Sequence, residues 1–455
     1  VLLYAQRAQR QDPLASELAR LFVAEALASS VGRLALRPRD FGLELGECIA
    51  LHPAGLPEIA EYSRGDKLAQ AGAALIARDG RLPPAMLDHD KELMRESFIR
   101  FGQEAVAPVA QAIHRDDLDI PESIIQGAAQ LGLFGVSIPQ RYGGLQPDEH
   151  PDTLMMLVVT EALSSASLGA AGSLITRPEI MARALLVGGT DAQKEHWLPR
   201  LASGEKLVAI SITEPDFGSD VAALKLRATR CEGGWKLSGS KTWCTSAGRA
   251  EVILVIARTD PDLSAAHRGL SMFMVEKPRF AGHEFAYRSP HGGQMSGRAI
   301  RTIGYRGMHS FDVFFEDFFV PAEALVGGAK GEGRGFYFTM AGLSGGRVQT
   351  AARANGVMQA AFDAGLGYAV SRKVFGKSIA SYPLMQARLA RMAAWLTASR
   401  QLSYVVAQQL DAGGGEMEAS LVKLFACRAA EWVTRDAMQM HGGSANCAAY
   451  YDQLG

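Results

Sequence analysis

A chain of 455 residues is too long for a single compact core, so we expect two to four domains. Apolar residues make up 48% of the chain and charged residues 21%, as in an ordinary globular protein. The formal net charge is −1 and the basic residues are dispersed, which gives no electrostatic reason to expect nucleic acid or a membrane surface as a partner.

The cysteines and histidines do not form metal-binding or disulfide patterns. Five cysteines are scattered without a C-x-x-C pair, which fits a reducing compartment and argues against a disulfide scaffold or a zinc site. Ten histidines show no H-E-x-x-H spacing, so we expect no metal. No apolar stretch approaches the roughly 20 residues that span a bilayer, and no signal peptide is present. The first residue is Val rather than Met, so we expect residues upstream of it.

The first half of the chain has a helical period. Residues 1–90 form an Ala-rich helical extension, with apolar residues at spacings of three and four, and "DGRLPP" at 79–84 reads as a linker. Residues 91–205 predict a second helical domain that contains "KELMRESFIRFGQEAVAPVAQAI" and "TDAQKEHWLPRLASGE". Thr190 is the expected N-cap of the latter helix.

The period changes to two between residues 206 and 325. "LVAISIT", "KLRATRCEGGWKLSGSKTW", "EVILVIART", "LSMFMVEKP" and "FDVFFEDFFV" predict strands. Helices resume over 326–455, after the connector "GGAKGEGRGF". The glycines of that connector resemble a phosphate loop, but the G-K-[ST] ending is missing. A run of strands between runs of helices predicts an α+β fold with segregated layers.

Two further features have simple interpretations. His441 precedes Gly442, which is the usual place of a histidine that interacts with the carboxyl end of a helix. A G-x-S-x-G motif is absent, so serine-hydrolase chemistry has no support in the sequence.

Four segments carry a resemblance to a known family. They are "AISITEPDFGSD" at 209–220, "SKTWCTSAG" at 240–248, "SRKVFGKSI" at 371–379 and "MQMHGG" at 438–443. In their order and separation they resemble the acyl-CoA dehydrogenase family, over roughly residues 91–445. The resemblance implies an N-terminal helical domain, a middle β-barrel or sheet domain and a C-terminal helical bundle. The helical extension of 1–90 adds to these. FAD is the implied cofactor.

The segment around Trp243 is implied to lie along the flavin ring. Trp243 would pack beside the isoalloxazine, and Thr245 would offer its hydroxyl or amide near flavin N5, where a hydride arrives. The structural alternative is a core aromatic residue followed by a strand-end hydroxyl.

The segment at 209–220 is implied to supply the rest of the flavin contacts from the same subunit. Thr213 would bind the pyrimidine edge of the flavin, between apolar walls made by Ile210 and Ile212. Gly218 would allow close approach of the backbone, and Ser219 would contact both the cofactor and acyl-CoA. The structural alternative is a strand followed by a Pro-Asp turn.

The C-terminal segments are implied to reach the flavin of a neighbouring subunit, so we expect a homodimer or homotetramer with shared FAD sites. Arg372 would bind the FAD pyrophosphate through its paired donors, and Phe375 would pack on the adenosine. Gln439 and Gly443 would contact the same flavin. The alternative for the first segment is a basic helix C-terminus capped by Gly376.

The helix that follows "GGAKGEGRGF" is implied to shape the acyl site. Arg347 matches an arginine of that site, and Ser344 stands where the family often has an Asp near the CoA nucleotide. Further segments, among them "RTIGYRGMHSFDVFFEDFFVPAEALVGG", resemble the branch that oxidises (2S)-methylsuccinyl-CoA to mesaconyl-CoA. A substrate with a free carboxylate needs a cation near it.

The implied reaction is removal of the α-proton by a carboxylate, hydride transfer to the flavin, and electron transfer to an electron-transfer flavoprotein. The catalytic residue is unassigned. The usual Glu follows "HGG" by some tens of residues, beyond the end of this chain, and the other known location is Gly346. We interpret Glu416, Glu418 and Glu431 as solvated helix residues.

Two explanations remain for the missing base: the chain is part of a longer protein, or it is a degenerate copy that binds FAD and acyl-CoA without dehydrogenating. The same fold would also suit another short-chain or branched-chain acyl-CoA dehydrogenase, an acyl-CoA oxidase, or a flavin monooxygenase.

Overall fold

The computed structural model describes residues 2–42, 44 and 56–446, and these divide into two compact units. Unit 1 contains residues up to 92, 354–405 and the chain from 422 on, and unit 2 contains 93–353 and 406–421. The helix α12 (Gly335–Ser371) contributes to both units, as do α13 (Pro383–Asp411) and α14 (Glu416–His441).

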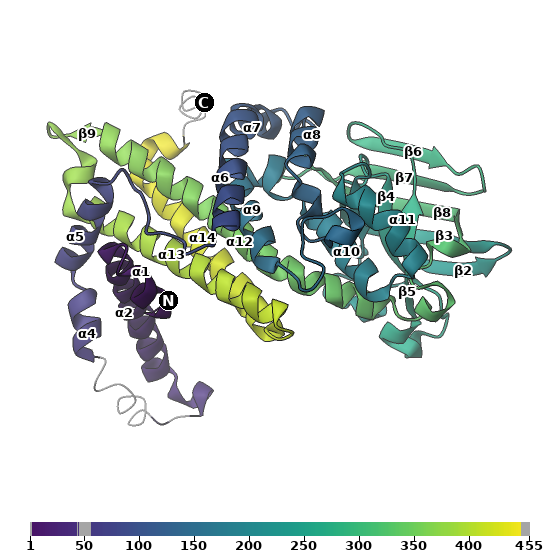
Figure 1. Cartoon of the computed structure of the whole chain (residues 1–455), viewed down its shortest axis with the longest axis horizontal. Coiled ribbons are helices and arrows are strands. Elements are labelled where there is room, and N and C mark those ends of the chain that lie inside the picture. The colour runs from purple at the N-terminus through teal and green to yellow at the C-terminus, as the bar shows by residue number, and fades with distance from the viewer. Residues whose placement is uncertain (1, 43, 45–55, 447–455) are drawn as a thin grey trace. The chain divides into compact units, whose positions relative to one another are not determined.

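Unit 1 is helical. Its N-terminal segment forms α1 (Leu2–Ala8), α2 (Pro13–Leu36), η1 (Pro38–Phe41), α4 (Leu56–Tyr62) and α5 (Gly65–Ile76). These precede α12, α13 and α14, which run side by side (Figure 1). A common apolar core joins Leu18 and Leu21 of α2 and Leu75 of α5 to Phe362 of α12 and Leu396 of α13. The predicted helical extension therefore packs on the C-terminal helices.

Close contacts fix the extension on α13. The carboxylate of Glu25 accepts hydrogen bonds from Arg391 and from the indole of Trp395, the latter at 3.1 Å. A methyl group added at Gly72 of α5 would lie 2.0 Å from the carbonyl oxygen of Gln386, so glycine is required where these two helices touch.

The helices of unit 2 come before its sheet. They are α6 (His89–Phe101, mostly in unit 2), η2 (Gly102–Val106), α7 (Ala107–Arg115), α8 (Glu122–Gln130), η3 (Leu133–Gly135), η4 (Gln140–Tyr142), α9 (Thr153–Ala166), η5 (Leu168–Gly172), α10 (Thr176–Gly188) and α11 (Asp191–Ala202). Thr190 caps α11 as predicted, because its hydroxyl accepts from the amide of Gln193 at 3.2 Å while the Gln193 side chain accepts from the Thr190 amide.

Eight strands form one mixed sheet in unit 2. They are β1 (Val208–Ser211), β2 (Arg227–Cys231), β3 (Gly234–Thr245), β4 (Val252–Arg258), β5 (Leu270–Glu276), β6 (Glu284–Arg288), β7 (Gln294–Ala299) and β8 (Ser310–Pro321). The order is β1-β4-β2-β3-β8-β7-β6, and β5 pairs with β4. Short helical turns η6 (Val221–Ala223), η7 (Leu263–Gly269), η8 (Ala322–Ala324) and η9 (Gly328–Gly331) connect the strands to one another and to α12.

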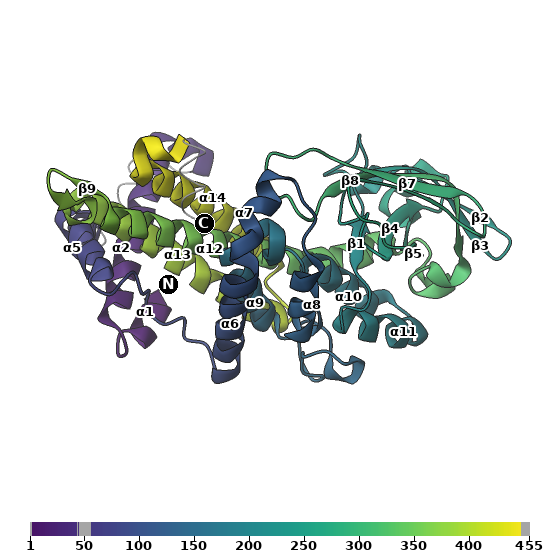
Figure 2. The ribbon, with the colours of Figure 1, turned by 90° about the horizontal axis from the view of Figure 1, so that it is seen from above.

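Strand β4 separates two apolar layers. On one face of the sheet, Ile253 and Val255 pack with apolar side chains of the other strands. On the opposite face, Leu254 and Ile256 pack with α10 and α11. Figures 1 and 2 show these two helices beside β4. A strand buried on both faces reads as the continuous apolar run "VILVIA".

The helix–sheet–helix prediction is confirmed, with two strands missing from it. Strands β6 and β7 were not expected, because only Phe285 and Met295 provide large buried apolar side chains in them. Strand β7 pairs with Phe311 to Glu316 of the long strand β8, and β6 pairs with β7 (Figure 2). No helix in the described ranges is long and apolar enough to cross a membrane.

Candidate active site

A buried ion pair joins the two segments that were predicted to contact the flavin. The ammonium group of Lys241 donates to the Glu214 carboxylate at 2.9 Å and to the carbonyl of Ile212 at 2.8 Å. The same carboxylate accepts the amides of Lys225 at 2.7 Å and Leu226 at 2.8 Å. The Lys241 side chain is 0% exposed and the Glu214 side chain 6%. Burial lowers the pKa of Lys241 to about 8, and the charge of Glu214 opposes this shift.

The segments at 209–220 and 240–248 are also joined through their backbones, next to the ion pair. The amide of Thr242 donates to the carbonyl of Thr213 at 2.9 Å. Ile210 lies near the end of β1, opposite Leu254 of β4, and Ile212 follows that strand. Ile210, Ile212 and Thr213 are all half-buried. The segment predicted to bind the flavin edge and the segment predicted to stack on the ring therefore lie side by side.

Trp243 lies in a β-bulge near the end of β3. Lys241 pairs with Val313 and Cys244 with Phe311, so Thr242 and Trp243 both stand opposite Asp312. The backbone φ of Trp243 is +57°, which is costly for a bulky residue, and its side chain is 56% exposed. A core aromatic residue is therefore ruled out, and the bulge holds an indole outside the protein interior.

The residues after Trp243 are held by β8. The hydroxyl groups of Thr245 and Ser310 lie 2.8 Å apart, and the amide of Ser246 donates to the carbonyl of His309 at 2.8 Å. Cys244 points inward, and burial raises the pKa of its thiol to about 12, so the thiol stays protonated. Thr245 is half-buried at this strand end.

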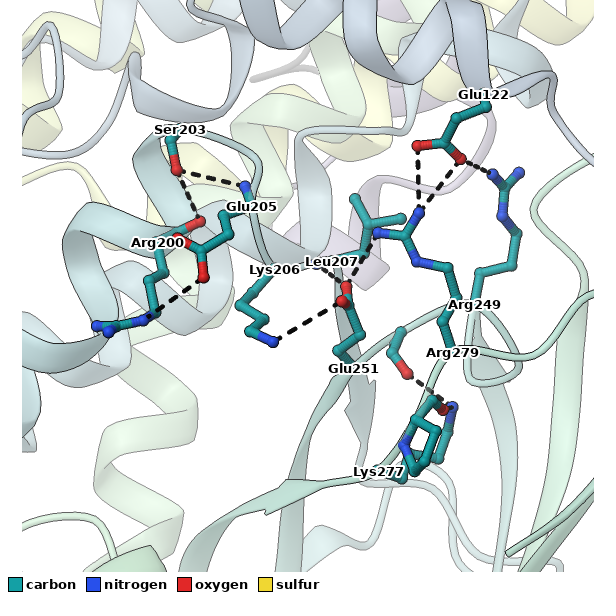
Figure 3. A network of polar contacts seen from close by, with 12 residues as sticks. Glu122, Arg200, Ser203, Glu205, Lys206, Leu207, Arg249, Glu251, Lys277 and Arg279 are labelled. Atoms are coloured by element: carbon teal, nitrogen blue, oxygen red, sulfur yellow. Dashed lines mark hydrogen bonds and ion pairs between the residues drawn. The ribbon is translucent and has the colours of Figure 1, made fainter.

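A polar network supports the turn that follows (Figure 3). Lys277 donates to the carbonyls of Gly248 at 2.7 Å and Ala250 at 2.6 Å. Arg249 binds Glu122 of α8 at 2.7 Å, and Arg279 binds the same carboxylate at 3.1 Å. The turn is tied in this way both to the helical part of unit 2 and to the end of β5.

Gly218 and Ser219 lie on an exposed loop. The turn before them is closed by reciprocal backbone hydrogen bonds between Glu214 and Phe217, at 3.0 and 3.1 Å, as the Pro-Asp sequence predicts. A methyl group added at Gly218 would meet no protein atom within 4 Å. The protein interior gives no reason for glycine there, and a ligand that approaches the backbone would give one.

Helix α12 carries the predicted acyl-site residues that belong to unit 2. Arg347 and Gly346 are half-buried, and the Ser344 side chain lies outside the described part of the structure. A methyl group added at Gly346 would lie 3.7 Å from Ile180 of α10. Helices α10 and α12 are therefore neighbours at this position.

The predicted contacts to a second flavin lie in unit 1. Helix α12 ends at Ser371, and β9 (Lys373–Val374) and β10 (Lys377–Ser378) form a hairpin, followed by η10 (Ile379–Ser381). Phe375 and Gly376 are its two turn residues, with φ of +52° and +77°. The alternative prediction of a helix capped by Gly376 is wrong, because the helix has already ended. Arg372 is exposed, and Phe375 is 92% exposed.

The second C-terminal segment lies at the end of α14. Gln439 is exposed on its last turn, and Gly443 lies in η11 (Gly442–Asn446). The ring of His441 bonds the carbonyl of Ala437 at 2.8 Å, so this histidine interacts with the carboxyl end of the helix as predicted.

The glutamates of α14 share one exposure class. Glu416, Glu418 and Glu431 are all exposed, in agreement with their interpretation as solvated helix residues.

A buried cationic cluster lies next to the strand end, and sequence reasoning missed it. Arg177 of α10 donates to the hydroxyl of Tyr305 at 3.0 Å and contacts the sulfur of Met308 at 3.6 Å. Arg353 of α12 approaches the same hydroxyl at 3.5 Å and the hydroxyl of Ser173 at 3.2 Å. Both guanidinium groups lower the pKa of Tyr305, against the effect of its burial. The sequence carries no local signal for this cluster, because Arg177 stands beside Thr176 and Glu179 in a mixed segment.

Comparisons with known proteins agree with this geometry. Three family models match in order: "Acyl-CoA dehydrogenase, N-terminal domain" over residues 88–205, "middle domain" over 209–318 and "C-terminal domain" over 333–451. The chain is 40% identical over 420 residues to a (2S)-methylsuccinyl-CoA dehydrogenase of Cereibacter sphaeroides, covering 91% of this chain and 73% of that protein.

Solved structures show the same fold. Butyryl-CoA dehydrogenase of Megasphaera elsdenii superimposes with a TM-score of 0.71 at 28% identity, covering 79% of this chain and 89% of that one. A glutaryl-CoA dehydrogenase of Mycobacterium smegmatis in complex with FADH2 superimposes with a TM-score of 0.69 at 25% identity, covering 79% of this chain and 86% of that one. The chain belongs to the acyl-CoA dehydrogenase family, whose members are FAD-dependent oxidoreductases that act on CH–CH bonds.

Loss of one partner of the Lys241–Glu214 pair will destabilise the protein. Glu214→Gln leaves a buried ammonium without its counter-charge, so we expect the free energy of unfolding to fall by about 3–5 kcal/mol. Urea denaturation measures this change. In the double variant Glu214→Gln/Lys241→Met the loss will be smaller than the sum of the two single losses, and strict additivity would contradict the coupling.

Proposed function

We propose that this protein catalyses FAD-dependent α,β-dehydrogenation of a short branched acyl-CoA with a second carboxylate, (2S)-methylsuccinyl-CoA, to give mesaconyl-CoA. The electrons removed from the substrate would pass to an electron-transfer flavoprotein. The protein would work in the bacterial cytoplasm. The single observation that carries the flavin assignment is the indole of Trp243, held half in solvent by a bulge at φ +57°. Support for the substrate comes from the Cereibacter sphaeroides relative, whose 40% identity extends over 91% of the chain.

The flavin would lie against the paired ends of β1 and β3. Trp243 would cover the ring system, Thr245 would place a hydroxyl or amide beside N5, and Thr213 would bind the pyrimidine edge. Ile210 and Ile212 would form the adjoining walls, and Gly218 and Ser219 would contact the cofactor from the open loop. Bound FAD would supply the acceptor for the hydride that leaves the β-carbon of the substrate. The protein would contribute hydrogen-bond donors that are already in position before the reaction begins.

The residues proposed to reach the FAD of a neighbouring subunit have the exposure that this role requires. Arg372 and Gln439 are exposed, and Phe375 is held at the tip of a two-residue hairpin turn. An aromatic side chain that is 92% exposed on a fixed turn is suited to packing on another molecule. Gly443, beyond the end of α14, completes this set, and the working unit would be a homodimer or homotetramer.

The carboxylate of the substrate would be recognised by Arg177 and Arg353. Arg177 is 9% exposed, and it bonds a carbonyl, a hydroxyl and a sulfur atom, with no carboxylate among its hydrogen-bond partners in the described part of the chain. A buried guanidinium is costly unless an anion accompanies it, so the site favours an acyl chain that brings its own charge. Arg177 contacts the sulfur of Met308, and the carbonyl of Met308 accepts a hydrogen bond from the amide of Ser246. Ser246 directly follows Thr245, so the arginine lies close to the proposed flavin contact. Arg347 and Ser344 would shape the remainder of the acyl-CoA site.

An anaerobic titration of the flavin-loaded protein with methylsuccinyl-CoA tests the proposal. We expect the flavin absorption band to bleach, because reduction of the flavin requires the bound cofactor, a working base and the correct acyl chain together. Rapid reoxidation in air would instead identify an oxidase or monooxygenase. A spectrum that shifts without bleaching, also with butyryl-CoA and isobutyryl-CoA, would identify a non-catalytic homologue. A protein that cannot take up FAD would contradict every flavoenzyme assignment.

Substitution of Arg177 will change substrate selection. With Arg177→Gln we expect kcat/KM for methylsuccinyl-CoA to fall by about 100-fold or more, since an ionic hydrogen bond to the carboxylate is lost. The rate with butyryl-CoA, measured in the same dye-coupled assay, will stay within a few fold of its original value. Arg298→Gln is the matched control, because Arg298 is exposed on β7. Equal losses for both substrates would contradict the assignment.

Substitution of Trp243 will separate flavin binding from folding. Because the side chain is exposed, Trp243→Ala should change the free energy of unfolding of the flavin-free protein by no more than about 0.5 kcal/mol. Flavin content and the flavin spectrum should both change. An unaltered flavin spectrum in this variant would remove Trp243 from the cofactor site.

A further inference from the structure

Two histidines and an aspartate from three distant segments meet at one point of unit 2. Asp117 lies just after α7, His283 directly before β6 and His309 directly before β8. One ligand atom from each residue lies within 4.8 Å of the other two. The Nε2 atoms of the two imidazoles are 3.0 Å apart, and the Asp117 carboxylate is 3.4 Å from Nε2 of His309 and 3.9 Å from Nε2 of His283.

The hydrogen bonds around His309 decide which ring nitrogen carries the proton. Its Nδ1 lies 3.0 Å from the carboxylate of Asp119, which accepts only, so Nδ1–H is the donor. In the neutral ring, Nε2 then carries a lone pair. That lone pair faces the carbonyl oxygen of Asp117 at 3.2 Å, besides the Asp117 carboxylate and the ring nitrogen of His283. The carbonyl of Asp117 is also 3.1 Å from Nε2 of His283. In the tautomer of His283 that carries its proton on Nδ1, the Nε2 lone pairs of both imidazoles and the Asp117 carboxylate face one small volume, where a cation would satisfy them.

We propose that Asp117, His283 and His309 form a binding site for a single divalent transition-metal ion of the Zn²⁺ class, with Asp119 orienting His309. In a tetrahedral zinc site with bonds of about 2.0–2.1 Å, neighbouring ligand atoms lie roughly 3.3 Å apart. The two imidazole nitrogens are 3.0 Å apart, and Oδ1 of Asp117 is 3.4 Å from Nε2 of His309, both close to that value. The other carboxylate oxygen, Oδ2, is 3.9 Å from Nε2 of His283. Imidazole nitrogen with a carboxylate is a ligand set that suits zinc, and solvent can occupy the fourth position because His283 is half-exposed.

The surroundings are those of a metal-binding histidine. A carboxylate that accepts the second N–H of a ligating imidazole fixes the ring and raises its basicity, and Asp119 does this for His309. Asp119 is itself held by the amide of Gly282 at 2.8 Å. The guanidinium of Arg306 approaches the Asp117 carboxylate at 3.7 Å, on its Oδ1 side. Asp117 and Asp119 supply two negative charges beside the imidazoles, and the positive charges of Arg306 and Arg249 act on these carboxylates.

The site would stabilise the strand end next to the proposed flavin. The carbonyl of His309 accepts the amide of Ser246, so an ion bound to the His309 ring would restrain the backbone beside Thr245 and Ser310. The ion has no part in hydride transfer, and the assignment does not depend on the proposed function. Histidine spacing predicted no metal, and it could not indicate this site, because the ligands stand 166 and 26 residues apart in the chain.

Zinc binding by the flavin-loaded protein tests the inference. After removal of metal with a chelator, Zn²⁺ alone is titrated in competition with a chromophoric chelator, and bound zinc is counted by elemental analysis. We expect one zinc ion per chain and a rise in the melting temperature on zinc addition. Asp119→Asn should weaken binding by about 10–100-fold, and His283→Ala by more than that. His89→Ala, an exposed histidine on α6, should bind zinc like the unaltered protein.

His283→Ala is the decisive variant, because a half-exposed side chain can be removed without unfolding the protein. Absence of saturable binding at one ion per chain would overturn the proposal and leave a hydrogen-bonded histidine pair. Binding that His283→Ala and Asp117→Asn leave unchanged would also overturn it, since the ion would then occupy adventitious surface positions. Loss of the zinc-induced rise in melting temperature in both variants, with flavin content unaltered, would support it.

Discussion

The site depends on one buried ion pair, Lys241 with Glu214. Its two members stand 27 residues apart and belong to the two segments that carry the proposed flavin contacts. Two charges removed from water need further hydrogen bonds in addition to their mutual attraction. Here the carboxylate also accepts two amides, and the ammonium also binds a carbonyl. The pair thus holds β3 against the chain that follows β1, beneath the proposed flavin contacts.

The strained backbone at the end of β3 follows from the inward position of Lys241. Lys241 must point inward and Cys244 is buried, so the extra residue between them forces Trp243 into a positive φ and outward. Around this point the surroundings are strongly fixed: Thr242 binds Thr213 and Asp312, and Thr245 binds Ser310. Strain of this kind persists only where neighbouring contacts over-determine it, and an exposed indole gains nothing for the apolar core. This exposed position is consistent with the proposed role of Trp243 beside the flavin.

Two further groups converge on the same strand end from the helical part of unit 2. Arg177 reaches it through Met308, and Asp117 and Asp119 reach it through His309. Met308 and His309 are consecutive, and their carbonyls both accept from Ser246. One short stretch before β8 therefore connects the proposed carboxylate site, the proposed metal site and the proposed flavin site.

Period and motif in the sequence alone determined the helix–sheet–helix order, the N-cap at Thr190 and the family, because these depend on residues that are neighbours along the chain. The strands β6 and β7 were not predicted, since they bury few apolar side chains; β7 pairs with β8, and β6 pairs with β7 at the edge of the sheet. Only the tertiary structure decided that Trp243 is exposed rather than buried, that Arg177 and Arg353 turn inward to one tyrosine, and that Asp117, His283 and His309 meet. Those outcomes depend on contacts between residues far apart in sequence, and the periodicity of a segment carries no information about its distant partners.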